Sequence, residues 1–199
     1  MKRIIISCLI LTLYTTCFAQ KKDVFGMYWD MNVPMNDGYL TKMSFAGMKF
    51  EYRHFFNDKL SAGLATNWDS YRQYFNRQTY VKQDGNYAVT SDFVAHVYTL
   101  PITATAHHYF ARKGSFRPYA GVALGAQYME QQLYYNVYTS SENNWGFVGR
   151  PEIGVFIGPP HMGMGFVLGL SYSYATNKNG ITKEDSFKNF GISVGMAFQ

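Results

Sequence analysis

Seven charged residues are the best candidates for chemistry in this sequence, because they lie on the polar side of segments in which apolar and polar residues alternate. They are Asp30, Lys49, Glu51, Arg53, Arg117, Arg150 and Glu152. Charges of both signs facing one another in a narrow space either neutralise one another or line a path for ions. We expect neutralisation, because an unpaired buried charge is costly.

The histidines and serines predict neither a metal site nor a catalytic centre. His107 and His108 are adjacent and so point to opposite faces of a strand, while His54, His96 and His161 are scattered without ligand spacing. Ser171 and Ser173 have no histidine nearby in the sequence, and serine is a weak nucleophile without a base. We therefore expect no enzymatic activity and no cofactor.

The elements that must position these residues are strands, because period two runs through the chain from Val24 onward and almost nothing has helical period. The pattern predicts eight strands, at about residues 24–33, 44–56, 60–68, 92–110, 116–128, 150–157, 165–174 and 189–198. Short connections near residues 57, 111 and 158 alternate with long ones at 34–43, 71–91, 129–144 and near 176. This alternation is typical of a transmembrane barrel with short periplasmic turns and long outer loops.

The second face of these strands distinguishes a membrane barrel from a soluble one. A soluble barrel should expose a face crowded with charged residues, whereas here that face is mostly Gly, Ser, Ala, Asn and Tyr. Small residues with a few charges suit the tight interior of an eight-stranded barrel. The sequence thus predicts an all-β, eight-stranded, antiparallel up-and-down transmembrane barrel whose apolar residues face lipid.

Composition supports an exported membrane protein. Aromatic residues make up 18% of the chain and charged residues only 16%, below the roughly 25% of soluble domains. The net charge of +5, which would fall by two on loss of Lys2 and Arg3, is too small to indicate nucleic acid as a partner.

The N-terminus has the pattern of a secretory signal. Lys2 and Arg3 precede an apolar run that is too short to cross a bilayer as a helix, and small residues precede a cleavage site between Ala19 and Gln20. We expect residues 1–19 to be the signal peptide and residues 20–199 the barrel, with both cysteines, Cys8 and Cys17, lost with the leader. Lipidation at Cys17 is a weaker alternative.

Three segments carry a family resemblance: Tyr98-Thr99-Leu100-Pro101-Ile102, His108-Tyr109-Phe110 and Arg117-Pro118-Tyr119-Ala120-Gly121-Val122-Ala123-Leu124-Gly125. Together they resemble the outer-membrane β-barrel domain family, which groups with the small barrels similar to OmpX and the OmpA transmembrane domain. The resemblance implies an integral protein of a Gram-negative outer membrane, in contact with its lipids and inserted by the barrel-assembly machinery. The family's terminal aromatic signal is altered here, because Gln199 follows Phe198.

The sequence favours a structural or surface-interaction barrel whose lumen is closed by packed side chains. The runner-up, which would be porin-like, is a narrow conduit for small hydrophobic or polar solutes; the third is a lipid-modifying enzyme, since some small barrels deacylate lipid with a Ser-His pair. The loop at 71–91, rich in Tyr, Gln and Asn, is a candidate surface for an extracellular partner.

Overall fold

The computed structural model describes residues 23–35, 40–81, 88–111, 114–136, 138–159, 163–178 and 185–199. The predicted signal peptide with its cleavage site at Ala19 and Gln20, together with His161, lies outside these residues. Eight strands follow one another: β1 (Asp23–Pro34), β2 (Ser44–Phe55), β3 (Leu60–Val81), β4 (Ala88–Tyr109), β5 (Phe116–Tyr135), β6 (Tyr138–Ile157), β7 (Met164–Ala175) and β8 (Phe187–Phe198).

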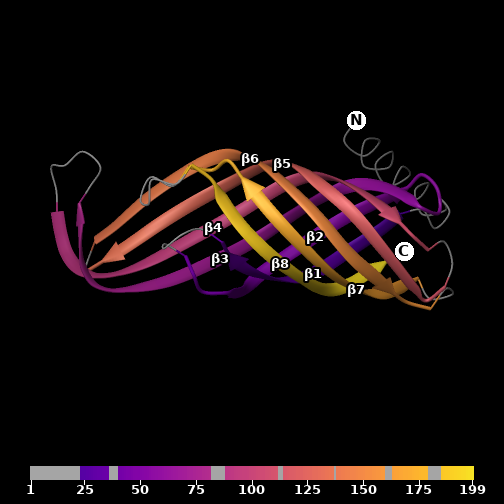
Figure 1. Ribbon diagram of the computed structural model, residues 1–199, viewed down its shortest axis with the longest axis horizontal. Helices are drawn as coiled ribbons and strands as arrows, with labels where there is room; N and C mark the ends of the chain where they lie inside the picture. The colour runs from indigo at the N-terminus through magenta and orange to yellow at the C-terminus, as the bar shows by residue number, and fades with distance from the viewer. Residues whose placement is uncertain are drawn as a thin grey trace, which may run out of the picture.

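The strands close into a single barrel. Each strand pairs antiparallel with the next one in the sequence, and β8 pairs with β1 in a register that places Phe25 opposite Phe198 (Figure 1). Closure satisfies the backbone hydrogen-bonding groups of every strand without leaving a sheet edge in the wall. The prediction of an eight-stranded up-and-down barrel is confirmed, and β1 begins at the end of the barrel where β8 finishes.

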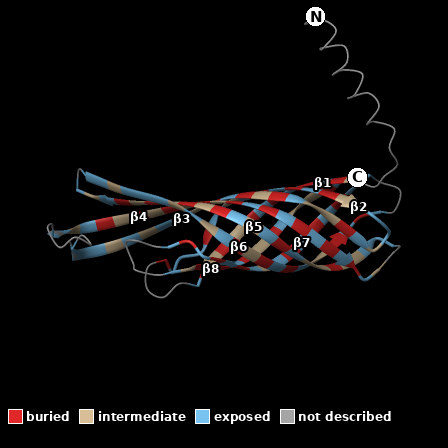
Figure 2. Cartoon of the chain, turned by 90° about the horizontal axis from the view of Figure 1, so that it is seen from above, coloured by how far each residue is buried: buried red, intermediate tan, exposed pale blue. Residues whose placement is uncertain are grey.

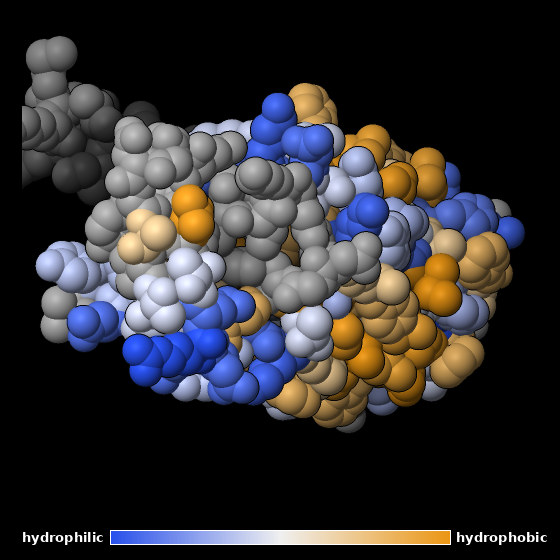
Figure 3. Space-filling model, turned by 60° about the vertical axis from the view of Figure 1, so that its left-hand side comes forward, coloured by the Kyte–Doolittle hydropathy of each residue, from blue (hydrophilic) through white to orange (hydrophobic). Residues whose placement is uncertain are grey.

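Alternation along each strand divides the side chains into an inner and an outer set, which gives the chequered pattern of buried and exposed residues in Figure 2. Leu64, Leu124 and Phe166 are each at least 60% exposed, whereas the charged Lys49 and Glu51 are almost fully buried. The predicted orientation is therefore confirmed, with apolar residues outside and polar residues inside. Hydrophobic side chains gather over the barrel wall in Figure 3.

The interior has apolar side chains at both ends and polar ones between them. Near the chain termini a cluster packs around Tyr28, Tyr109, Tyr119 and Phe156. At the opposite end a second cluster packs around Tyr71, Phe93, Met129 and Phe187. The described part of the chain contains no helix long and apolar enough to cross a membrane.

Two of the predicted long loops are wrong, because most of their residues belong to strands. β3 continues to Val81 and β4 starts at Ala88, so the expected loop at 71–91 is largely a hairpin. β5 and β6 likewise extend through 129–144 and leave only residues 136 and 137 between them. These extensions lie beyond the apolar belt and need no apolar alternation, while their Tyr and Thr residues favour extended backbone.

Pro101 interrupts one seam of the barrel, as its position in a strand predicts. The pairing of β3 with β4 has a gap between Thr66↔Ile102 and Asp69↔Thr99, while the pairing of Pro101 with Gln127 of β5 is retained. Proline has no N–H and cannot donate a ladder hydrogen bond, so the gap falls on the side that would receive it.

Candidate functional site

A compact network of two acids and two bases lies in the barrel interior beside the apolar cluster of Tyr28, Tyr109 and Tyr119. Lys49 Nζ lies 2.9 Å from Glu152 Oε2 and 3.4 Å from Glu51 Oε2. Arg53 Nη2 lies 2.7 Å from Glu51 Oε2 and 3.6 Å from Glu152 Oε1. Lys49, Glu51 and Arg53 alternate along β2 and so share its inner face, and β6 brings Glu152 across the barrel to meet them. Each carboxylate thus contacts both cations, which offsets the cost of burying all four charges.

Aromatic residues and a histidine make the remaining contacts with these four charged side chains. Arg53 donates a hydrogen bond of 2.7 Å to the Tyr109 hydroxyl and lies over the Tyr119 ring at 4.8 Å from its centre. His107 Nε2 lies 2.5 Å from Glu152 Oε1. The Lys49 ammonium lies 5.4 Å from the centre of the Tyr28 ring. The cations therefore have aromatic faces and a hydroxyl as well as carboxylates around them.

A second set of buried polar residues lies nearer the opposite apolar cluster, which contains Tyr71. Asp30 accepts hydrogen bonds from the amide of Asn67 and, at 2.5 Å, from the Ser193 hydroxyl. Asn32 donates a hydrogen bond of 2.9 Å to Asp69. Arg150 is buried in the same interior, and its Nε and Nη2 atoms have no hydrogen-bond partner among the described residues.

The structure thus brings together some of the seven charged residues singled out from the sequence and separates others. Lys49, Glu51, Arg53 and Glu152 form one ion-paired network, while Asp30 is held by neutral polar groups. Arg117 stands apart near the terminal end, with its guanidinium 4.2 Å from the centre of the Phe156 ring. Among the described residues the buried acids number four, and they are matched by three buried bases and one half-buried base: Asp30, Glu51, Asp69 and Glu152 against Lys49, Arg53, Arg150 and Arg117.

The set of candidate residues chosen from the sequence omitted Asp69 and His107, which the structure places in the interior. Asp69 continues the inner alternation of the third strand, so its position in the pattern could have identified it. His107 is one of two adjacent histidines, and only the face of its strand, shared with Thr103 and Thr105, separates it from the outward His108.

The structure also brings together three side chains that could ligate a metal, although they are far apart in the sequence. Atoms of Glu51, His107 and Glu152 lie within 4.8 Å of one another in the barrel interior. Both carboxylates are already paired with Lys49 and Arg53, so a metal ion would have to displace a cation or lie beside two of them. The arrangement is that of an ion-pair network rather than a metal centre.

A second candidate site is a four-stranded sheet that projects from the barrel at the end away from the start of β1 and the end of β8 (Figures 1 and 2). The β3–β4 pairing runs out to Val81↔Ala88, and the β5–β6 pairing to Tyr135↔Tyr138. Phe93↔Tyr135 joins the two hairpins into one sheet, which we call the projecting sheet. β2 stops pairing with β3 at Ser70, and β7 does not pair with β6 before Val148. Residues 71–81 and 138–143 therefore lack a neighbouring strand on one side within the described chain, whereas Asn144 and Phe147 are hydrogen-bonded to residues 176–178.

Polar and aromatic side chains order the surface of the projecting sheet. The Tyr74 hydroxyl donates a hydrogen bond of 3.0 Å to Asp92, which raises the pKa of Tyr74. His96 packs edge-on against the ring of Tyr134. Burial lowers the pKa of the His96 imidazole, and the nearby Arg72 guanidinium acts in the same direction. These contacts order the outer side of the sheet, while its inner side contributes Phe93 and Leu133 to the apolar cluster around Tyr71.

The fold is that of the small eight-stranded outer-membrane barrels. The chain is similar to the neisserial surface protein NspA, with 16% identity, a TM-score of 0.55, and 90% of this chain and 97% of that one covered. It is also similar to Ail, the attachment invasion locus protein of Yersinia pestis (15% identity, TM-score 0.51, coverage 89% and 98%). The outer-membrane protein OprG of Pseudomonas aeruginosa matches with 13% identity, a TM-score of 0.51 and coverage of 89% and 95%.

No known protein family matches the chain, and no curated protein matches it in sequence. At these identities the resemblance to solved structures establishes the fold, which agrees with the OmpX-like and OmpA-like barrels that the sequence resembles.

Proposed function

We propose that the protein is a non-enzymatic barrel of the outer membrane that holds the projecting sheet outside the cell as a binding surface for an extended peptide segment of an external partner. The observation that carries the proposal is the unequal length of the strands. β3, β4, β5 and β6 have 20 or 22 residues, whereas β1, β2, β7 and β8 have 12. Twelve residues are close to what a tilted strand needs to cross a bilayer, so the additional residues of the four long strands serve the projecting sheet.

The free sides of the projecting sheet suit strand addition. The N–H and C=O groups along one side of residues 71–81 and 138–143 can pair with an added strand, and main-chain pairing of this kind gives affinity without a deep pocket. Exposed Tyr74 and Tyr138 supply apolar area for contact with the partner. Arg72 and Arg77 on one free side and Glu142 on the other give the two edges opposite charge.

Shortened hairpins test this function. In one variant, residues 74–94 are replaced by Asn-Gly, which leaves the pair Gln73↔Ala95 beside a two-residue turn. In a second variant, residues 132–141 are replaced in the same way above the pair Gln131↔Glu142. The probe is a phage-displayed library of random short peptides panned against the protein in phosphatidylcholine vesicles.

The full-length protein should enrich peptides that neither shortened variant retains, while all three proteins show compact migration on gels before boiling and slower migration after it. Equal retention by the shortened variants would contradict the proposal, as would the absence of enrichment.

The packed interior supports a sealed barrel rather than a conduit. Apolar clusters fill the lumen at both ends of the barrel, on either side of the buried polar residues. The hollow lined by Arg53, Phe55, Tyr109 and Phe156 has a volume of only about 10 Å³. We expect no unitary conductance when the refolded protein is reconstituted in planar bilayers. Steady single-channel currents that persist in a preparation free of other porins would overturn the sealed barrel.

A further inference from the structure

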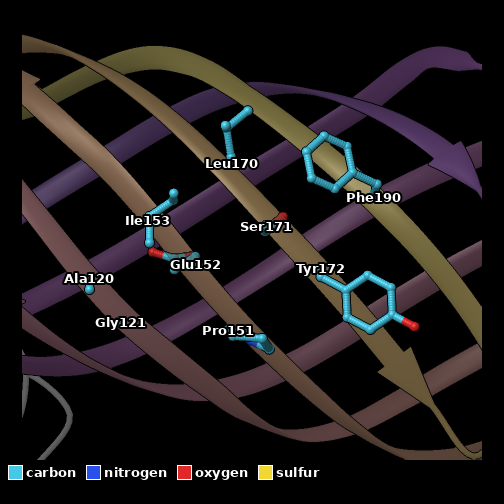
Figure 4. A pocket seen from close by; sticks show the side chains of 9 residues that line it. All are labelled: Ala120, Gly121, Pro151, Glu152, Ile153, Leu170, Ser171, Tyr172 and Phe190. Atoms are coloured by element: carbon cyan, nitrogen blue, oxygen red, sulfur yellow. The ribbon is translucent and has the colours of Figure 1, made fainter.

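The outer wall of the barrel carries an apolar groove across β5, β6, β7 and β8, and Figure 4 shows the residues that line one part of it. It consists of two adjoining hollows of about 390 and 440 Å³, which share Ala120, Ile153 and Leu170. Each hollow has the size of a site that holds an organic ligand. The side chains that line the groove are mostly apolar: Phe110, Pro118, Ala120, Pro151, Ile153, Val155, Leu168, Leu170, Tyr172 and Phe190.

Small residues and an interrupted seam produce this groove. Ala120 contributes little side chain to the outer face of β5, so the larger side chains around it stand above its methyl group. Pro151 has no N–H, and the β6–β7 pairing is interrupted beside it, between Gly149↔Tyr174 and Glu152↔Ser171. The groove is therefore built into the wall by the sequence of β5 and β6.

A cation lies at the outer end of the groove. Tyr172 pairs with Phe190 at the groove, and the next outward-facing pair along these strands is Tyr174↔Lys188. Two residues along a strand span roughly 7 Å. The Lys188 ammonium lies 6.0 Å from the centre of the Tyr174 ring, beyond the apolar lining and near the end of β7 from which the sheet projects. A positive charge at this level faces the headgroups of the outer leaflet.

We propose that the groove is a specific binding site for one acyl chain of a phosphorylated lipid of the outer leaflet, with Lys188 binding the phosphate. The inference rests on the proposed location in the outer membrane. It goes beyond general contact with lipid, because it assigns one wall of the barrel to one lipid in a fixed position.

A second copy of the chain fits this surface less well. Two copies in one membrane related by a two-fold axis along the membrane normal meet at equal depth, so their Lys188 residues would approach each other. Like charges at that distance oppose association, whereas a phosphate beside Lys188 is attracted to it.

Variants that fill the groove test whether it is a lipid-binding site. The probe is bisphosphorylated lipid A added to full-length protein in detergent, and native mass spectrometry counts the lipids retained by each barrel. Ala120→Phe fills the space that both hollows share and should raise the Kd for lipid A roughly tenfold, which corresponds to about 1.4 kcal/mol. Ala104→Phe is the matched control, because Ala104 is an exposed alanine of the wall outside the groove.

The charge is tested with Lys188→Gln, which should reduce the preference for lipid A over phosphatidylcholine, while Lys178→Gln should leave it unchanged. Equal retention by Ala120→Phe and Ala104→Phe, or a dimer in place of the lipid-bound monomer, would overturn the proposal. All variants are first checked for boiling-sensitive migration and for extraction from the membrane fraction. If the wild-type barrel passes both checks but shows no lipid selectivity, only the proposed lipid-binding site is refuted. If the wild type fails these checks, the membrane location itself is refuted.

Discussion

At the scale of residues, the ion-paired network shows how a narrow barrel accommodates charge. Glu51 and Glu152 each contact Lys49 and Arg53, and the rings of Tyr28 and Tyr119 flank the cations. Replacing such a network by apolar residues would cost little in principle, but removing one member leaves the others uncompensated. The stability of the barrel should therefore be most sensitive to the loss of a single partner.

Glu152→Ala tests this sensitivity. The substitution removes the carboxylate shared by Lys49, Arg53 and His107, and it should lower the free energy of unfolding by about 3 kcal/mol. Urea unfolding of protein refolded into lipid vesicles, followed by circular dichroism, measures the change. Glu142→Ala removes an exposed carboxylate from the projecting sheet and should alter stability by less than about 0.5 kcal/mol. Similar values for the two variants would show that the network does not stabilise the barrel.

The sequence could place the seven charges on the inner face, but it could not say which would meet. Period two fixes only the face on which a side chain lies. Contact between Lys49 and Glu152 depends on the closure of the barrel and on the stagger of strands that are far apart in the sequence. For the same reason Arg117, on the same face as Tyr119, lies outside the network and stacks on Phe156 instead.

At the scale of elements, close approach between strands depends on particular glycines. A Cβ atom added at Gly63 would overlap the Tyr52 carbonyl oxygen of the neighbouring strand, so β2 and β3 could not keep their present approach. At Gly169, which also faces inward, an added Cβ would meet its nearest neighbour, the Tyr119 hydroxyl, at 3.4 Å. The two positions thus differ in the space available, although they look alike in the sequence.

Gly63→Ala should consequently destabilise the barrel by about 2 kcal/mol relative to Gly169→Ala, because a backbone must shift to admit the methyl group. The midpoints of urea unfolding in vesicles measure the difference. Equal midpoints would mean that the strands separate at Gly63 without cost.

The projecting sheet carries the main failure of the sequence prediction. Residues 71–91 and 129–144 are rich in Gln, Asn and Tyr and lack clear apolar alternation, so their sequence predicts loops. Alternation marks a strand only where one face is buried in lipid or core. A sheet that stands in water can be polar on both faces and is then recognised only by its pairing partners.

The projecting sheet should loosen at acid pH through His96. Because the pKa of His96 is lowered in the folded sheet, the unfolded hairpin binds more protons below about pH 6.5. The stability contributed by neutral His96 is therefore complete above that pH and decreases as the pH falls. Hydrogen-exchange protection factors for residues 88–98 should be lower at pH 5 than at pH 7.

His96→Gln serves as the control, and its protection factors should depend less on pH. Histidines at the other end of the barrel, such as His54 and His108, do not bear on this local measurement. The same pH dependence in both proteins would assign the effect to another group.

At the scale of the whole molecule, the fold and the outward orientation of its apolar face could be predicted from the sequence, because both depend on the alternation of apolar and polar residues. The inner face is small and polar, the outer face is apolar, and neither could be exchanged without placing charges in hydrocarbon. The length of the four long strands did not follow, and it is this asymmetry that gives the molecule two different ends. One end has the chain termini and tight turns, and the other has the projecting sheet.

The orientation in the membrane can be tested with single cysteines, since Cys8 and Cys17 fall in the predicted leader and the rest of the chain has none. Thr79→Cys places a thiol far out on the projecting sheet, and Asp58→Cys places one in the turn between β2 and β3. A membrane-impermeant maleimide added to intact cells should label Thr79→Cys and not Asp58→Cys, and both should react once the cells are permeabilised. Labelling of Asp58→Cys alone would show that the barrel is inserted the other way round. Labelling of both in intact cells would show that no membrane separates the two ends, and the function of the projecting sheet as an external binding surface would then have no basis.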